Sequence, residues 1–231
     1  MYNLAHLSIS SESISTLNSE SEEEEDYFHH DRSAMSSFLS VGSQDSQHAA
    51  NFDHDASASI YDSLVVGHAS DNIQLELTAL RMSTNASEHQ LRHAIVAAFV
   101  KYIVQQVKSG TSIREAVAQV FVKHVDLVNK SIFDKNQASK ADQIDFMFSL
   151  QKELSQKDGG DQILLSAATK LVELESVEDD GILQWWDDAK SSESEELVKV
   201  KAKTQQLIDF LNQSSEEESD EEEDEDEDDS E

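Results

Sequence analysis

Cysteine and proline are both absent from the 231 residues of this chain. The absence of cysteine excludes a disulfide framework and thiolate zinc sites, and it fits a reducing compartment. No run of 18 apolar residues occurs, and the N-terminus lacks the basic and apolar leader of a secretory signal. We therefore expect a cytoplasmic protein that makes no membrane contact.

The sequence also lacks the short motifs of common catalytic sites. No GxxxxGKS/T, GxGxxG, GxSxG, HExxH or CxxC pattern occurs, so phosphate cradling, acyl transfer and metalloprotease chemistry lack their expected parts. We expect neither covalent catalysis nor a cofactor. His29 and His30 do not predict a metal site, because no fold is expected there to fix ligands. Four other histidines lie singly on expected helices, where a histidine is usually structural: His68, His89, His93 and His124.

Basic residues are scarce, with 17 Lys and Arg against 48 Asp and Glu, and the formal charge is -31. Direct binding to nucleic acid is not expected, because phosphate neutralisation needs a basic surface. The acids gather at both ends of the chain. Residues 214–231 hold fourteen Asp or Glu and four Ser, so we expect an extended, solvated tail. Residues 1–58 hold fourteen Ser and eleven acids, which predicts a disordered linker.

Residues 59–213 form the globular part, and a single domain of this size buries roughly 70% of its unfolded surface. Asp71 is expected to cap a helix whose apolar stripe contains Ile73 and Leu77, with Glu76 outside that stripe. The longest predicted helix runs from Ser87 to Lys108 and opens with a capping box of Ser87 and Gln90.

Further helices follow with short connections. Ser112 and Glu115 form a second capping box, and the helix it opens is predicted to continue through Val125 and Val128. A polar connection at 134–140, a helix broken at Gly159 and Gly160, and one more helix precede the segment 181–190. The last helix is predicted over 195–213, with Lys199, Lys201 and Lys203 outside its apolar stripe. The fold class is therefore all-α, with antiparallel helix pairs stacked as a short solenoid.

Three segments carry a resemblance to a known family. They are NIQLELTALRMSTN at 72–85, ILQWWDD at 182–188 and LIDFLNQSSEEESDEEE at 207–223. Together they resemble the C-terminal catalytic domain, of the W2 or HEAT type, of the epsilon subunit of eukaryotic translation initiation factor 2B. The resemblance covers about residues 60–225. It implies an atypical HEAT-like helical fold, and it suggests that this chain is part of a larger subunit.

The resemblance implies guanine-nucleotide exchange on translation initiation factor 2, without covalent chemistry. An exchange factor binds the nucleotide-free G protein more tightly than its GDP form and so shifts a population. A Leu-Glu pair important for exchange in the family matches Leu75 and Glu76 here. The implied partners are the G domain of the gamma subunit and lysine-rich segments of the beta subunit of initiation factor 2. Other subunits of the exchange complex would bind through regions outside this chain.

Aromatic and acidic residues near the C-terminus are the implied docking elements for the lysine-rich segments. Trp185 and Trp186 would offer a stacking or cation-π surface, and Asp187 and Asp188 would be exposed. An alternative reading makes both tryptophans core anchors, with Trp186 at least mainly buried. The tail adds seven partner-binding candidates and three serines with the acidic context of casein kinase 2-type sites: Glu216, Glu217, Glu218, Asp220, Glu221, Glu222 and Glu223, and Ser214, Ser215 and Ser219.

A second function remains open. The C-terminal domain of initiation factor 5 ends in the same kind of aromatic and acidic boxes, and it gathers initiation factors without exchanging nucleotide. This chain would then be a non-catalytic adaptor. A GDP-release assay distinguishes the two functions.

Overall fold

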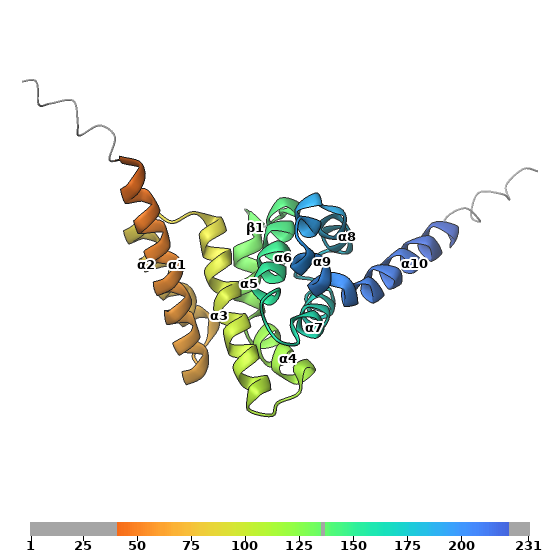
Figure 1. Cartoon of the computed structure of the whole chain (residues 1–231), viewed down its shortest axis with the longest axis horizontal. Helices are drawn as coiled ribbons and strands as arrows, with labels where there is room; N and C mark the ends of the chain where they lie inside the picture. Colours follow the sequence, from red (N-terminus) through yellow and green to blue (C-terminus); the bar gives the residue numbers. More distant parts are fainter. Residues whose placement is uncertain (1–40, 135–136, 222–231) are drawn as a thin grey trace, which may run out of the picture. The chain divides into compact units, whose positions relative to one another are not determined.

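The computed structural model describes residues 41–134 and 137–221, which lie in one compact unit, Ser40–Glu231. Helices make up nearly all of it, so the predicted all-α class is confirmed. The described α-helices and 3-10 turns, drawn in Figure 1, are α1 (Val41–Val66), α2 (Ser70–Thr84), α3 (Glu88–Lys108), α4 (Ile113–Lys123), α5 (Val125–Ile132), α6 (Lys140–Leu154), α7 (Gly160–Glu173), α8 (Asp179–Asp187), η1 (Ala189–Ser192), α9 (Glu195–Lys201), η2 (Ala202–Thr204) and α10 (Gln205–Glu221).

The helices pack in two rows, as expected for stacked pairs. One row contains α1, α3, α6 and α8, and the other contains α4, α7 and α9, while α3–α4 and α6–α7 pair across the rows. Helix α2 packs on α1 and α5, and α10 contacts α8 and η2. In Figure 1, α3 to α7 lie between the α1–α2 pair and the C-terminal helices. The arrangement is a HEAT-like stack with a helix pair at each end.

A small hairpin interrupts the helical pattern at the predicted polar connection. Strands β1 (Phe133–Asp134) and β2 (Gln137–Ala138) pair antiparallel, with Phe133 opposite Ala138. In the described part of the chain, no helix is long and apolar enough to cross a membrane.

The folded part begins earlier than the predicted boundary at residue 59. Helix α1 starts at Val41, and Phe52, Ala56, Ile60 and Leu64 are buried along one face of it. This spacing of four residues gives a narrow apolar stripe, which packs on α3. The linker prediction is therefore wrong for the C-terminal part of residues 1–58. Residues 1–40 lie outside the described residues.

The helix predicted from Ser112 through Val128 is in fact two helices. Ser112 caps α4 as expected, by accepting a bond from the Glu115 N–H, but α4 ends at Lys123. His124 adopts a non-helical backbone conformation, and α5 begins at Val125, which is only half-buried. The buried imidazole of His124 packs 6.0 Å from the Phe99 ring and lies 3.1 Å from Ser70 Oγ. Tertiary packing thus overrides a continuous apolar pattern here.

Three other details of the predicted helices need correction. Ala69, not Asp71, is the N-cap of α2, and it contributes no side-chain bond. The last predicted helix, 195–213, is divided by η2 into α9 and α10, and α10 continues to Glu221. By contrast, the Ser87–Gln90 capping box at the start of α3 is present as predicted.

A close approach between α6 and α8 fixes the position of α8. Gln143 is fully buried, and its Oε1 accepts a bond from the Glu178 N–H at 3.0 Å. A Cβ at Gly181 would lie 2.2 Å from that same oxygen. Glycine at 181 therefore lets the first turn of α8 rest directly on α6.

Candidate functional site

Helix α2, which carries the Leu75–Glu76 pair, is anchored on its inner face. Ile73 and Leu77 are buried in the core. At its start, Ser70 Oγ donates to the Lys123 carbonyl at 3.2 Å and contacts His124 Nδ1. Lys123 Nζ in turn donates to the Gly67 carbonyl at 3.0 Å. The junction between α4 and α5 therefore holds the turn from which α2 starts.

Of the predicted exchange pair, Leu75 lies on the opposite, outer face of α2, and Glu76 lies at the side of the helix that faces α1. Leu75 is 73% exposed, and Glu76 is also exposed. Ser63 of α1 is buried, and its Oγ donates to Glu76 Oε2 at 3.4 Å. The other contact of this hydroxyl is His68 Nδ1, at 3.3 Å. This bond is long and lies at the protein surface, so it holds the carboxylate only weakly.

The grouping of Ser63, His68 and Glu76 differs from a nucleophile triad. In such a triad the imidazole lies between the hydroxyl and the carboxylate, so that it can take the hydroxyl proton. Here the serine lies in the middle and donates its proton to the carboxylate. The geometry therefore orients Glu76 and does not activate Ser63.

An exposed apolar stripe that includes Leu75 runs along the outer face of α2. Leu75, Ala79 and Met82 recur at i, i+4 and i+7 on α2, and all three are exposed, Met82 at 80%. Val65 and Val66, at the end of the neighbouring helix α1, are 59% and 70% exposed. Large apolar side chains that face water on one helix pair are typical of a protein-binding surface.

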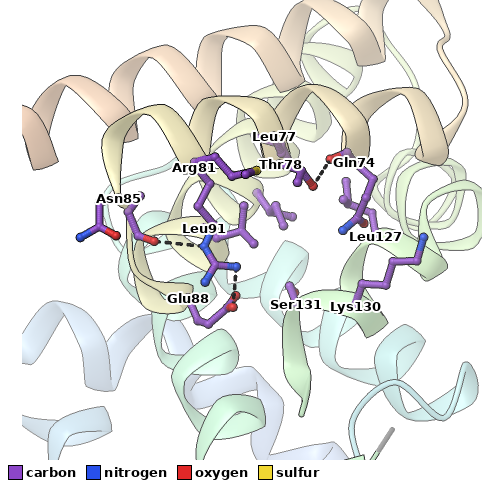
Figure 2. Close-up of a pocket in the computed structure, with 13 residues that line it drawn as sticks. Gln74, Leu77, Thr78, Arg81, Asn85, Glu88, Leu91, Leu127, Lys130 and Ser131 are labelled. Atoms are coloured by element: carbon purple, nitrogen blue, oxygen red, sulfur yellow. Dashed lines mark hydrogen bonds and ion pairs between the residues drawn. The ribbon is translucent and has the colours of Figure 1, made fainter. Parts of the chain in front are cut away.

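A pocket of about 320 Å³ opens between α2, α3 and α5 beside this stripe. Its apolar lining includes Leu77 and Leu127, and Figure 2 shows Asn85 and Lys130 at opposite ends of it. Arg81 reaches across and pairs with Glu88 at 2.5 Å, while its Nε donates to the Ala86 carbonyl. Arg81 and Glu88 thus offset each other, and Lys130 is the other charged residue of the lining.

The second predicted site, on α8, is organised around a buried tryptophan. Trp185 has no exposed surface, and its Nε1 donates to Gln151 Oε1 at 3.1 Å. The Nε2 of the same amide donates to the carbonyls of Ser191 and Leu197, at 2.8 and 2.9 Å. Gln151 is fully buried, so all three bonds form away from water. One glutamine of α6 thus joins α8, η1 and α9.

Trp186 occupies an intermediate position. Its ring is half-buried and meets Trp185 edge to face, with 6.1 Å between centroids. Lys201 Nζ lies over this ring, 4.6 Å from its centroid. The expectation of two aromatic rings that stack on a partner therefore does not fit the structure. Trp185 is inaccessible, and Trp186 already has a cation from its own chain on one face.

The two aspartates that follow differ in their surroundings. Asp187 is exposed, as expected. Asp188 is half-buried, and its Oδ1 accepts the Lys190 N–H at 2.8 Å, so it caps η1. Asp187 is thus the fully exposed member of the pair, and Asp188 has a structural role as well.

Lys201 is the residue that sequence reasoning placed least well. It was expected outside the apolar stripe of its helix, yet it is only 6% exposed. Its acceptors lie on α8 and η1, which no pattern within α9 could reveal. The roles of Gln151 and Ser63 could not be predicted either, because polar residues in a helix normally indicate solvent contact.

The tail candidates are covered in part. Helix α10 extends through Ser214, Ser215, Ser219 and the acids up to Glu221, whose side chains are not described, and Glu222 and Glu223 lie outside the described residues. In residues 41–134 and 137–221, no group of three or more His, Cys, Asp or Glu residues could hold a metal ion.

Two comparisons with known proteins point to the same family of translation factors. Residues 142–231 match the W2 family model, described as eIF4-gamma/eIF5/eIF2-epsilon. The chain is 31% identical over 210 residues to translation initiation factor eIF2B subunit epsilon of Schizosaccharomyces pombe. The match covers 90% of this chain and 29% of that relative, so the chain spans less than a third of the relative's length.

Proposed function

Because this chain belongs to the W2-domain family of eIF2B epsilon subunits, we propose that it promotes GDP release from translation initiation factor 2. The observation that carries this proposal is the presentation of Leu75 and Glu76. Both are exposed on a helix whose inner face is buried, beside further exposed apolar side chains. The chain would act in the cytoplasm as the exchange portion of a larger subunit.

The proposed mechanism is a shift of population. The apolar stripe of α2 would dock on the G domain of the gamma subunit, with Leu75 as an anchor. The Glu76 carboxylate would then compete for the Mg²⁺ or for a phosphate-binding lysine of the G protein. Tighter binding to the nucleotide-free state than to the GDP state releases GDP without any bond chemistry.

The C-terminal helices would supply a second contact with initiation factor 2. Asp187 is exposed at the end of α8, and α10 leads into the acidic tail. These acids would attract the lysine-rich segments of the beta subunit and accelerate association. In this proposal Trp185 and Gln151 hold the acidic surface in place, and the acids make the contact.

The test is a stopped-flow assay of fluorescent GDP release from initiation factor 2, with the full chain in excess. Glu76→Gln removes the charge and keeps the shape of the side chain. Asp71→Asn is the matched control, because Asp71 is also an exposed carboxylate on α2. Its contact with Lys130 Nζ, at 3.6 Å, is long, so the substitution should disturb the fold little. We expect release to fall at least tenfold with Glu76→Gln, and to stay within about twofold with Asp71→Asn.

Equal release by Glu76→Gln and the parent chain would remove Glu76 from the site. A parent chain that binds initiation factor 2 but leaves GDP release at its intrinsic rate would instead be the adaptor. The assay therefore separates the two functions in a single experiment.

A further inference from the structure

Lys201 has an unusual position for a lysine. Its side chain enters the space between α9, the end of α8 and η1, and only 6% of the residue is exposed. Nζ donates to the Trp186 carbonyl at 2.9 Å, to Ser191 Oγ at 2.6 Å and to Ser192 Oγ at 2.7 Å. Every acceptor in this set is neutral.

A buried ammonium group with neutral acceptors lacks a charge to offset its lost hydration. Burial lowers the pKa of Lys201 accordingly, and the nearby carboxylate of Asp187 opposes this shift in part. An anion placed against Nζ would therefore gain more here than at an exposed lysine, where water screens the charge.

One of the three acceptors is open to solvent. Ser192 is exposed at the end of η1, whereas Ser191 is fully buried. The residues after Ser192 are acidic, with Glu193 at +1 and Glu195 at +3. This is the local context that acidophilic protein kinases prefer. An exposed hydroxyl in such a context can enter a kinase site, which a buried hydroxyl cannot.

We propose that Ser192 is a phosphorylation site and that its phosphate forms an ion pair with Lys201. In the transfer, Ser192 Oγ forms a bond to the γ-phosphorus of ATP, and the bond from that phosphorus to the β–γ bridging oxygen breaks. The leaving ADP keeps the electron pair, and the hydroxyl proton passes to the catalytic base of the kinase. The product carries a charge of roughly -1.5 to -2 within reach of Nζ.

The phosphate would act on the structure through Lys201. Phosphate–lysine contacts are charge-assisted and stronger than the neutral hydroxyl contact that they replace. Because the same Nζ also holds the Trp186 carbonyl, the ion pair would fasten η1 to α8 and α9 together. The proposal concerns the packing of these elements and does not depend on nucleotide exchange.

The experiment uses the full chain, a purified acidophilic kinase and Mg-ATP, with sites mapped by mass spectrometry. The tail serines Ser214 and Ser215 serve as internal controls, since they share the acidic context and the sequence holds no lysine from residue 204 to the end of the chain. A ³¹P titration then compares the second pKa of each phosphoserine with the ordinary value of about 6. We expect the pKa of phospho-Ser192 to be at least half a unit below those of the tail phosphoserines, and to return to them in urea.

A stability measurement supplies an independent readout. Kinase-treated parent chain is expected to melt about 2 to 4 °C above kinase-treated Ser192→Ala, which keeps the tail phosphates. Lys201→Gln should remove the pKa shift of phospho-Ser192. If this variant does not fold, the comparison of the parent chain with and without urea takes its place. No incorporation at Ser192 while the tail is fully modified would overturn the proposal. An ordinary pKa would also overturn it, as would a lower Tm, because repulsion from the neighbouring acids would then outweigh Lys201.

Discussion

The two candidate regions of this molecule use their residues in opposite ways. On α2, the predicted functional side chains Leu75 and Glu76 face water, and other residues such as Ile73 hold the helix in place. On α8, Trp185 is itself a core residue, and of the predicted residues around it only Asp187 is fully exposed. The predicted functional residues are therefore separate from the core on α2 and partly built into it on α8.

This difference has a practical consequence for mutagenesis. A substitution at an exposed position of α2 leaves the core untouched, so a loss of activity there would point to the proposed contact with a partner. A substitution in the tryptophan pair removes packing and a three-bond amide network at the same time. Loss of binding in such a variant would not identify a binding residue. The predictions below test the difference, starting with the largest effect.

Trp185→Ala should destabilise the fold most. A buried aromatic residue replaced by alanine typically costs about 3 to 5 kcal/mol of unfolding free energy, and Gln151 Oε1 would lose its donor as well. We expect the Tm to fall by more than about 6 °C in a thermal melt followed by circular dichroism. Trp186→Ala is the matched control and should cost less than half as much, because that ring is only partly buried. Equal losses would contradict the distinction between the two tryptophans.

The second prediction concerns acid and the anchor of α2. Burial, with a smaller contribution from Lys123, lowers the pKa of His124 to about 4. In the unfolded chain this imidazole binds a proton below about pH 6.5, whereas in the folded chain it stays neutral until about pH 4. The unfolded state therefore binds more protons in this interval, and stability falls as the pH is lowered from about 6.5 to 4.

The expected loss attributable to His124 is about 2 to 3 kcal/mol at pH 4. His124→Gln should flatten this part of the pH profile, and the difference between the two profiles isolates His124 from the carboxylates. Hydrogen exchange should show α2 opening before α8, because His124 contacts Ser70 at the start of α2. A profile unchanged by the substitution, or earlier opening of α8, would argue against this anchor.

The sequence predicted local features well and tertiary ones poorly. The Ser87–Gln90 cap lies within four residues, so it could be read directly, and it is present. Phe52 and Ala56 were missed, because they are single apolar residues among serines and acids, one per helical turn, and such a composition predicts a linker. They are buried by packing against α3, which lies elsewhere in the sequence. The expectation that Trp186 at least is mainly buried is wrong, because Trp185 is the fully buried ring and Trp186 is only half-buried. Adjacent residues point about 100° apart on a helix, so only one of the two rings can face the core directly.

The same difference between local and tertiary features applies to the residues of the candidate sites. Glu76 could be predicted as exposed because it lies outside the apolar stripe of α2, and it is exposed. Lys201 was misplaced because its three acceptors belong to other elements. The proposed role of Leu75 and Glu76 rests on the family resemblance, since an exposed carboxylate on a helix carries no functional signal of its own.

The third prediction tests steering by the acidic end. Asp187→Lys reverses an exposed charge and should slow association with a lysine-rich peptide by about two- to fivefold at low ionic strength. The difference should shrink at physiological salt, where the Debye length is about 8 Å. Asp188→Lys would also remove the cap of η1, so a melt must accompany it. The measurement is the stopped-flow association rate at two salt concentrations. A rate that changes neither with the substitution nor with the salt concentration would exclude steering by Asp187.

The smallest expected effect is the most informative for the comparison. Glu76→Ala removes an exposed side chain whose bond from Ser63 Oγ is long, at 3.4 Å, so the unfolding free energy should change by no more than about 0.5 kcal/mol. Ser63→Ala supplies the other half of the test, because Ser63 is buried and also contacts His68. If Glu76 acts on a partner, its removal abolishes GDP release while the melt stays in place, and Ser63→Ala lowers release only modestly by leaving the carboxylate less well oriented. If instead Glu76 served mainly to satisfy Ser63, the two variants would lose similar stability, and α2 would resemble α8 in joining function to folding.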